Sequence, residues 1–333
     1  MFGSRLRELR QGLSLTQGQL AARAGVSRQL ISAVEAGRHL PRVDAAAALA
    51  DALSVSVEDL LRDDRETAFG VSEPPVEGAS VRVARVGDRL VCVPARPEGE
   101  AWTSANGVVR DGAVELFSRL DPAAIIAGCD PAIGLVARLV EVSAGPALLP
   151  ASTTSAAAAA ALVGGRVHAA VVHGPEERLP IPEPGVRRIE MARWQVGLCA
   201  PPELPDTWAA EALAGRLAVI QRDPGAASQD AFERAADAAA LAGASRATGH
   251  LDAAAWARRT GCAAVTMEPA AAAFGLAFHP LEEHVAQLWL PTDHLDVAGV
   301  RRFLDELTGP RLRRRLDAIG GYDLSRVGVE VAA

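Results

Sequence analysis

Three residues at predicted strand ends carry side chains that could bind a metal ion or sense oxidants. Cys129 and Asp130 follow the apolar strand AAIIAG, and His173 ends the strand HAAVVHG, so the three could converge at one edge. A thiol beside an imidazole can hold a transition metal or haem, and a thiolate of low pKa could react with oxidants. The alternative is that Cys129 is a small residue buried under a turn. His168 precedes its strand, at the opposite end, and is expected to be structural.

Other strand ends are suited to holding an anion. In open α/β sheets ligands bind where strands end and helices begin, and a helix N-terminus offers free N–H groups and a positive dipole end. Small hydroxyl residues there would suit an oxyanion such as molybdate or tungstate. The alternatives are simple helix capping by residues 152–154 and a surface ion pair for Arg222. We expect these strand ends to form one ligand-binding site. Besides Cys129, Asp130 and His173, its predicted residues are Ser152, Thr153, Thr154, Arg222, Ser228 and Glu268.

Residues 15–37, LTQGQLAARAGVSRQLISAVEAG, predict two short helices joined by a tight turn. Thr16 can cap the first helix, and Gly25 supplies the left-handed residue where it stops. Ser27 caps a second helix that buries apolar residues at helical spacing through Ala36. Polar residues then face outward near its start, as in a helix-turn-helix whose second helix enters the DNA major groove. The predicted DNA-contacting residues are Gln17, Ser27, Arg28, Gln29, Ser32 and Arg38.

This segment resembles the helix-turn-helix domain of the Cro and lambda-repressor type, the XRE family. The family pattern appears as Gln17, Ala21, Gly25-Val26-Ser27, Ile31-Ser32 and Glu35-Ala36-Gly37. Residues 5–10 resemble its first helix, and residues 41–61 resemble its last two. The resemblance covers about the first 64 residues and implies an all-α, five-helix DNA-binding head. The alternative, an ordinary helical hairpin, needs no Arg-Gln pair at a capped helix start.

Charge supports DNA binding in the head only. The whole chain has a net charge of −7, and all 34 of its basic residues are arginines. In residues 1–42, seven arginines against Glu8 and Glu35 give +5, whereas in residues 43–64 one arginine against six acids gives −5. Attraction to phosphates therefore falls on the first three predicted helices, and the last two are expected to face away from DNA.

The chain of 333 residues is long enough for two or three compact units. After the head, residues 65–80 form a Pro- and Gly-containing linker, and residues 81–118 predict a small β region. Two alternating runs around Gly87-Asp88 indicate a hairpin, and Asn106-Gly107 indicates another turn.

From residue 121 onward, apolar strands alternate with amphipathic helices, which predicts parallel sheets covered on both faces. The most distinctive segments are, in order, GCDPA (128–132), Ser152-Thr153-Thr154 before a helix, GGRVHAAVVHG (164–174), WQVGL (194–198), QRDPGAASQDAF (221–232), the run 249–281 and GYDLSRVG (321–328). They resemble the ligand-binding domain of type II periplasmic binding proteins, in the cytoplasmic version related to molybdenum proteins and fused to regulators.

The resemblance implies an α/β domain over residues 119–328, with ligand in a cleft between two hinged lobes. Lobe one is expected over residues 119–190 and 288–328, and lobe two over residues 191–287. The chain departs from the family where a GSGTR-like loop is usual, because here Gly225-Ala226-Ala227-Ser228-Gln229 follows Arg222. A second guanidinium is thus missing from the expected anion site.

Several protein classes are not indicated. The chain has no G-x-S-x-G elbow, P-loop, H-E-x-x-H or G-x-G-x-x-G, so we expect no enzyme. There is no run of about 18 apolar residues and no signal peptide before the first helix, which predicts a soluble, cytoplasmic protein with no membrane partner. The cysteines lie far apart without C-x-x-C spacing, which predicts reduced thiols and no zinc framework. They are Cys92, Cys129, Cys199 and Cys262.

The remaining histidines show no ligand spacing, which is typical of structural residues. They include His250, His279, His284 and His294. Similarly, residues 311–315, RLRRR, are expected on the solvated face of a terminal helix.

These patterns predict a one-component DNA-binding transcription regulator. It would bind double-stranded DNA at a palindromic operator as a homodimer. A small ligand in the cleft would control it, first a small oxyanion such as molybdate or a molybdenum compound. One alternative is a metal- or redox-responsive regulator that uses Cys129 and His173. Others are a second domain that serves as a ligand-free dimerisation scaffold or as an enzyme.

Overall fold

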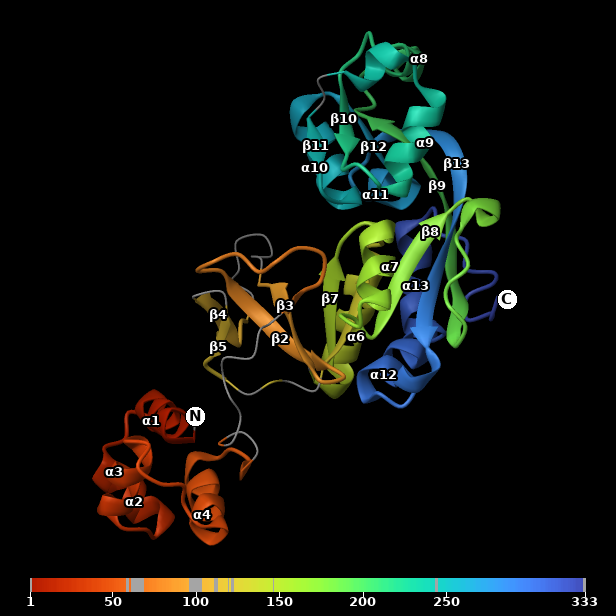
Figure 1. Ribbon diagram of the computed structural model, residues 1–333. Coiled ribbons are helices and arrows are strands. Elements are labelled where there is room, and N and C mark those ends of the chain that lie inside the picture. Colours follow the sequence, from red (N-terminus) through yellow and green to blue (C-terminus); the bar gives the residue numbers. More distant parts are fainter. Residues whose placement is uncertain are drawn as a thin grey trace. The chain divides into compact units, whose positions relative to one another are not determined.

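The chain divides into two compact units (Figure 1). The computed structural model describes residues 2–57, 60, 69–95, 104–110, 113–118, 120, 123–145, 147–242 and 245–331. The first unit comprises Met1–Ala68, Pro75–Val83 and Pro94–Leu120, and the second comprises Phe69–Pro74, Ala84–Val93 and Asp121–Ala333. No helix among the described residues is long and apolar enough to cross a membrane.

The first unit begins with a small helical domain, as predicted. Its described helices are α1 (Phe2–Gly12), α2 (Gln17–Ala24), α3 (Arg28–Glu35) and α4 (Val43–Leu53). One apolar side chain from each of three helices, Leu20, Ile31 and Leu49, is fully buried in a common core. Most of the predicted fifth helix falls outside the described residues.

Local signals set the ends of α2 and α3. The Thr16 hydroxyl accepts from the backbone N–H of Gln19, whose side chain reaches back to Thr16, so a capping box starts α2. Gly25 ends this helix at φ +64°, a conformation that residues with a Cβ rarely adopt. Ser27 then caps α3 by accepting from the N–H of Leu30. The turn between the two helices therefore matches the sequence prediction.

Five short strands follow: β1 (Phe69–Gly70), β2 (Ser80–Val86), β3 (Arg89–Pro94), β4 (Gly107–Arg110) and β5 (Ala113–Leu116). Their order in the sheet is β1-β3-β2-β4-β5. The predicted hairpin around Gly87-Asp88 joins β2 to β3. The predicted turn at Asn106-Gly107 is wrong, because Gly107 begins β4 and buried Asn106 bonds through its side chain to the N–H and carbonyl of Val83.

The second unit contains a sheet of eight strands in the order β11-β10-β12-β9-β13-β8-β6-β7. The strands are β6 (Ala124–Gly128), β7 (Leu148–Ser152), β8 (Ala169–Gly174), β9 (Val186–Ala200), β10 (Val219–Arg222), β11 (Arg246–Ala247), β12 (Ala263–Met267) and β13 (Ala277–Pro291). The helices are α6 (Ala132–Ala144), α7 (Ser155–Val163), α8 (Trp208–Leu213), α9 (Ala227–Ala235), α10 (His250–Thr260), α11 (Glu268–Ala273), α12 (Ala298–Leu307) and α13 (Pro310–Ile319). Short 3-10 turns occupy Glu176–Arg178, Ala238–Leu241 and Thr292–His294.

Two long central strands divide this sheet into two lobes (Figure 1). Lobe one has parallel strands β6, β7 and β8, packed with α6, α7, α12 and α13. Lobe two has parallel strands β10, β11 and β12, with α8, α9, α10 and α11. The prediction of wholly parallel sheets is wrong at the centre, because β9 and β13 run antiparallel to each other and to their outer neighbours.

A close backbone approach places the Cys129 loop. Gly128 ends β6, and a Cβ atom there would lie 2.8 Å from both the carbonyl oxygen and the Cβ of Val171 in β8. Only glycine therefore lets β6 end against β8, with Cys129 next in the chain and His173 two residues beyond Val171.

His168 supports the opposite end of the same strands. Its Nδ1 accepts from the backbone N–H of Ile125 at 3.0 Å, and its ring is buried. Burial, with a smaller contribution from the charge of His294, lowers the pKa of His168 to about 4. The ring must therefore be neutral to accept this bond.

We expect acid to destabilise the second unit through His168. The unfolded chain takes up the proton near pH 6.5, while the folded ring resists it down to about 4. The free energy of unfolding should therefore fall with pH across this window, by about 3 kcal/mol in full. The substitution His168→Asn keeps an acceptor but does not titrate, so denaturant titrations from pH 7 to pH 4 should show a shallower loss than in wild type. Equal slopes would contradict the assignment.

Candidate functional site

The outer face of α3 presents the residues predicted to contact DNA. Arg28, Gln29 and Ser32 are exposed along the first two turns of the helix, and Arg38 is exposed just beyond it. Ser27 lies at the helix start, where its hydroxyl is engaged as the cap. Guanidinium and amide side chains in this position have the groups that read guanine and adenine edges in the major groove.

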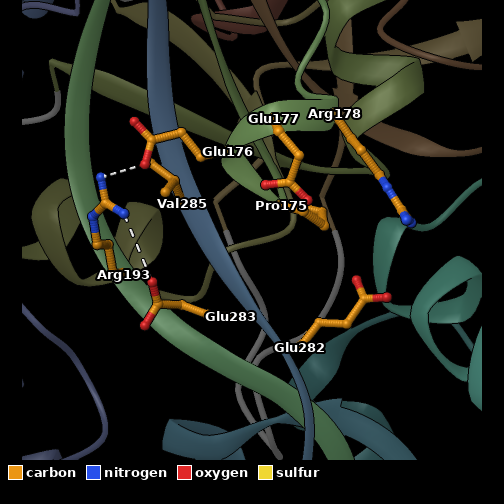
Figure 2. A pocket seen from close by; sticks show the side chains of 8 residues that line it. All are labelled: Pro175, Glu176, Glu177, Arg178, Arg193, Glu282, Glu283 and Val285. Carbon is orange, nitrogen blue, oxygen red and sulfur yellow. Dashed lines mark ion pairs between the residues drawn. The ribbon is translucent and has the colours of Figure 1, made fainter.

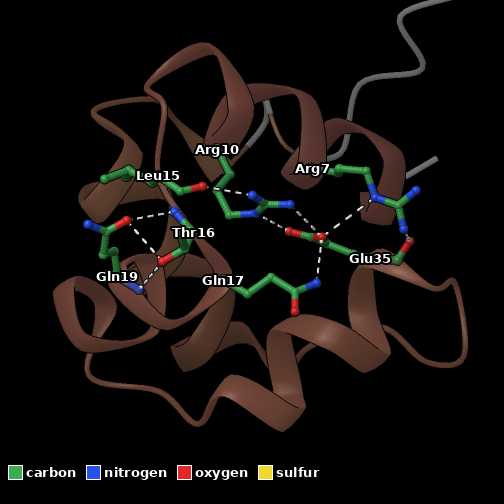
Figure 3. A network of polar contacts seen from close by, with 7 residues as sticks. All are labelled: Arg7, Arg10, Leu15, Thr16, Gln17, Gln19 and Glu35. Atoms are coloured by element: carbon green, nitrogen blue, oxygen red, sulfur yellow. Dashed lines mark hydrogen bonds and ion pairs between the residues drawn. The ribbon is translucent and has the colours of Figure 1, made fainter.

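Glu35, at the end of α3, is buried and holds three elements of the head together (Figure 3). Arg10 of α1 donates to both of its carboxylate oxygens, at 2.6 and 3.0 Å. Gln17 of α2 donates at 3.0 Å, and Arg7 lies 3.5 Å away. Burial alone would raise the pKa of Glu35, but the bonds from Arg10 and Gln17 outweigh it and the net pKa is lowered. Gln17, one of the predicted DNA-contacting residues, is thus bonded within the head.

Breaking this network should unfold the helical domain. Glu35→Ala leaves the Arg10 guanidinium buried without its carboxylate, a loss of about 3 kcal/mol or more. Hydrogen exchange of α1–α3 peptides in the full chain should show faster opening. Glu115→Ala, which removes an exposed ion pair with Arg110 in the same unit, is the matched control and should change little. Equal protection in the two variants would contradict a structural role for Glu35.

In the second unit, the centre of the sheet gathers a buried cluster of sulfur and imidazole groups. Cys129, after β6, lies 2.8 Å from the Nε2 atom of His173 in β8. His250, the first residue of α10, brings a ring nitrogen within 4.8 Å of both ligand atoms. Ser155 holds the backbone of His173, because its hydroxyl accepts from the His173 backbone N–H at 3.1 Å. We call Cys129, His173 and His250 the Cys–His cluster.

Burial controls ionisation in this cluster. It raises the pKa of Cys129 to about 12, against a smaller opposing effect of the Arg222 charge. Burial also lowers the pKa of both His173 and His250 well below the ordinary value, reinforced by neighbouring His284 and Arg222. At neutral pH the cluster is therefore a thiol with two neutral imidazoles, and a spontaneous low-pKa thiolate is not supported.

Asp130 lies beside the cluster and is fully engaged. Its carboxylate accepts from the backbone N–H of Ala132, from the Trp194 indole at 3.3 Å and from the Tyr322 hydroxyl at 3.0 Å. Burial raises the pKa of Asp130, although these three donors oppose the shift. Trp194 also packs against the His173 ring, at 4.6 Å between centroids and with the ring planes tilted by 53°. Asp130 thus positions the aromatic wall of the site.

A chain of polar groups leads outward from His173. Its Nδ1 lies 2.9 Å from Nδ1 of His284 in β13, and His284 Nε2 lies 3.3 Å from the Glu282 carboxylate. Arg234 binds that carboxylate through two bonds and lowers the pKa of Glu282. Burial lowers the pKa of His284 to about 4, outweighing the opposing effect of Glu282.

Glu282 also lines an open pocket between the middle of the two central strands and the turn that follows β8 (Figure 2). The lining residues are Pro175, Glu176, Glu177, Arg178, Arg193, Glu282, Glu283 and Val285. Arg193 pairs with both Glu176 and Glu283 there. The outward chain from the cluster therefore ends at a solvent-facing carboxylate.

Arg222 and Ser228 belong to lobe two, and the Arg222 charge acts on Cys129, His173 and His250. Arg222 is 1% exposed and donates to the carbonyls of Ala247 and Thr248, at 3.2 and 3.3 Å. Within the part of the chain that the structure describes, its Nη1 atom, the Ser228 hydroxyl and both ring nitrogens of His250 are buried without a hydrogen-bond partner. Polar atoms buried in this way are rare in folded proteins.

The other predicted ligand residues are more exposed than the Cys–His cluster. Ser152 is exposed at the end of β7, and Thr153 is half-buried. Thr154 caps α7 by accepting from the Ala157 N–H at 3.2 Å, which is the capping alternative considered above. Glu268 begins α11 and is half-buried.

Sequence patterns did not point to several members of the site. His250 and His284 were expected to be structural, yet both face His173. Trp194 and Tyr322 lie within segments that carry the family resemblance, which was the one available signal for them. His250 comes from a different lobe and His284 from a central strand, so no local spacing joins them to His173.

Comparisons with known proteins agree with this architecture. Residues 1–63 match a family model described as a helix-turn-helix domain. Residues 138–308, just over half of the chain, match a model described as a PBP superfamily domain. The chain belongs to the PBP superfamily and carries a helix-turn-helix head, so both resemblances seen in the sequence are confirmed.

Two relatives match the head. An uncharacterized HTH-type transcriptional regulator, y4dJ of Sinorhizobium fredii, is 41% identical over 70 residues, which are 21% of this chain and 91% of that protein. One from Methanothermobacter thermautotrophicus is 44% identical over 64 residues, 19% of this chain and 93% of that protein. Among solved structures, the periplasmic molybdate-binding protein of Azotobacter vinelandii is 16% identical, with a TM-score of 0.47, over 60% of this chain and 98% of its own. The protein is a helix-turn-helix transcription regulator with a PBP-like domain.

Proposed function

We propose that a ligand bound between the two lobes controls how this regulator binds its operator. The observation that carries the proposal is the group of buried, unpartnered polar atoms on Arg222, Ser228 and His250. Each such atom costs about 1–3 kcal/mol when no partner replaces water. A domain serving only as a scaffold would gain stability from apolar side chains at these positions, whereas a ligand would supply the missing partners.

The lobe-two part of the site fits an anion. Arg222 offers a buried guanidinium N–H, and Ser228 offers a hydroxyl in the first turn of the nine-residue helix α9. The backbone N–H groups at that helix end add a positive dipole. Molybdate is the first anion to test, because the sequence resembles the molybdenum-related version of these domains. The Cys–His cluster, on which the Arg222 charge acts, is the second candidate.

Ligand control requires two states with different affinities. A ligand that bridges lobe one and lobe two would favour closed over open lobes. In a homodimer built on the PBP-like domains, that change would alter the spacing of the two heads. The DNA-reading residues would be Arg28, Gln29 and Ser32 on α3, with Arg38 and the capped start at Ser27 beside the phosphates. Gln17 would stabilise the head through Glu35 and contact phosphate only if it left that bond.

We expect Arg28→Ala and Gln29→Ala each to weaken operator binding by about 1–3 kcal/mol and to relax one base position, since each side chain would read one base edge. Binding should be measured by fluorescence anisotropy on operators selected from a random library. Arg314→Gln, on the exposed face of α13, is the control and should leave affinity unchanged. Unaltered affinity and base preference in both α3 variants would refute this reading face.

The same selection tests the homodimer. Selected sites should be palindromic, and sedimentation with a full site should give two chains per duplex. A single chain bound to an asymmetric site would rule the dimer out.

Isothermal calorimetry tests the anion. Molybdate and tungstate should bind the wild-type chain with one site, and Ser228→Ala or Arg222→Gln should weaken binding at least about tenfold, since a charge-assisted hydrogen bond contributes about 1.5–3 kcal/mol. Ser143→Ala, on the exposed side of α6, is the control. If neither anion binds, or if both site variants bind as well as wild type, the oxyanion assignment fails while the DNA result stands.

A further inference from the structure

We propose that Cys129, His173 and His250 bind one transition-metal ion, which joins lobe one to lobe two. The three candidate ligand atoms lie within 4.8 Å of one another, and all three residues are buried. This inference deepens the proposed function, because it gives the cleft ligand a chemical class. It rests on the geometry of the cluster and can be tested without DNA.

The donor set selects a class of metal. One thiolate sulfur and two imidazole nitrogens suit borderline or soft ions such as Zn²⁺, Co²⁺ or copper, and are poor ligands for Mg²⁺ or Ca²⁺. No carboxylate belongs to the set, because Asp130 is already engaged by Ala132, Trp194 and Tyr322. Three protein ligands leave a further position for water or an anion, and the Arg222 guanidinium lies close enough to favour a negative charge there.

The proton arrangement already suits metal binding at His173. The Glu282 carboxylate can only accept, so the proton between it and His284 belongs to His284 Nε2. Neutral His284 then has a bare Nδ1, and the proton in the 2.9 Å contact belongs to His173 Nδ1. His173 Nε2 is therefore an unprotonated nitrogen, 2.8 Å from Cys129 Sγ. Glu282 and His284 thus act as the outer groups that orient a metal-binding imidazole.

His250 gives an independent indication of a ligand. It is 1% exposed, and both of its ring nitrogens have no hydrogen-bond partner within the described residues. Its backbone is firmly held, because the Thr266 hydroxyl donates to the His250 carbonyl at 2.9 Å. The ring lies against the cluster, at 5.7 Å between the His250 and His173 centroids, and its unprotonated nitrogen has a lone pair available for a metal.

Metal binding has a defined proton balance. The S–H bond of Cys129 breaks, its electron pair forms the bond to the metal, and one proton is released to solvent. The two imidazoles lose no proton, because both are already neutral. No oxidant or reductant is needed.

The arrangement also makes the ion a clamp between the lobes. Cys129 and His173 come from β6 and β8 of lobe one, whereas His250 comes from α10 of lobe two. Opening the lobes would separate His250 from the other two ligands. A bound ion therefore favours the closed state, in the sense that the proposed regulation requires.

Cobalt titration of the full chain, freed of metal by a chelator, tests the site. We expect one Co²⁺ per chain, with the near-ultraviolet absorbance of a thiolate–cobalt bond and release of one proton into a weak buffer. Cys129→Ser and His250→Ala should each weaken binding more than about 100-fold and remove or alter that absorbance. Cys262→Ser and His279→Ala, which change a cysteine and a histidine outside the cluster, should bind as wild type.

A second variant tests whether Glu282 orients the metal-binding imidazole of His173. Glu282→Gln should weaken cobalt binding about 10- to 100-fold, as expected for an outer partner of a metal-bound histidine, with Glu283→Gln unaffected. Zn²⁺ should compete with cobalt for the site. Absence of stoichiometric cobalt binding, or binding that persists in Cys129→Ser and His250→Ala, would overturn the inference. A metal site without any effect on DNA affinity would instead refute regulation by the metal and leave the site intact.

Discussion

The antiparallel pairing of β9 with β13 is the interaction on which the second unit depends. Each strand has 15 residues, and the register runs from Ala277 opposite Ala200 to Pro291 opposite Val186. Lobe one attaches through β8 to β13, and lobe two attaches through β12 to β9. The middle of the pair, where His284 lies opposite Trp194, is therefore the place where strand ends of both lobes must meet.

The Glu35 network and the site between the lobes differ in one physical respect. The Glu35 carboxylate is paired by Arg10 and Gln17, so the network is complete within the head and serves stability. The site between the lobes leaves polar atoms of Arg222 and His250 without partners among the described residues. A satisfied cluster rigidifies and specifies a fold, whereas an incomplete one calls for a further partner such as water or an ion, or for a functional role.

The sequence was informative wherever a signal was local. Caps at Thr16 and Ser27 and the left-handed Gly25 defined the helix-turn-helix, and the convergence of Cys129 with His173 followed from two strands ending at one edge. The antiparallel centre was missed because the first half of β13 contains Pro280 and two glutamates and is only partly buried, so it lacks a clear alternation. His250 and His284 could not be placed from the sequence, because strand register and lobe packing, and not local spacing, bring them to His173.

The Glu282 carboxylate contacts both α9 and the polar groups that lead from His173 through His284. Arg234, in the last turn of α9, holds both oxygens of Glu282, and His284 donates to one of them. Ser228 lies in the first turn of the same helix. A shift of α9 on anion binding would therefore alter the group that sets the His284 proton. If an anion and a metal both bind, their affinities would then be linked through Glu282, and such coupling is reciprocal: each would change the affinity for the other by the same factor.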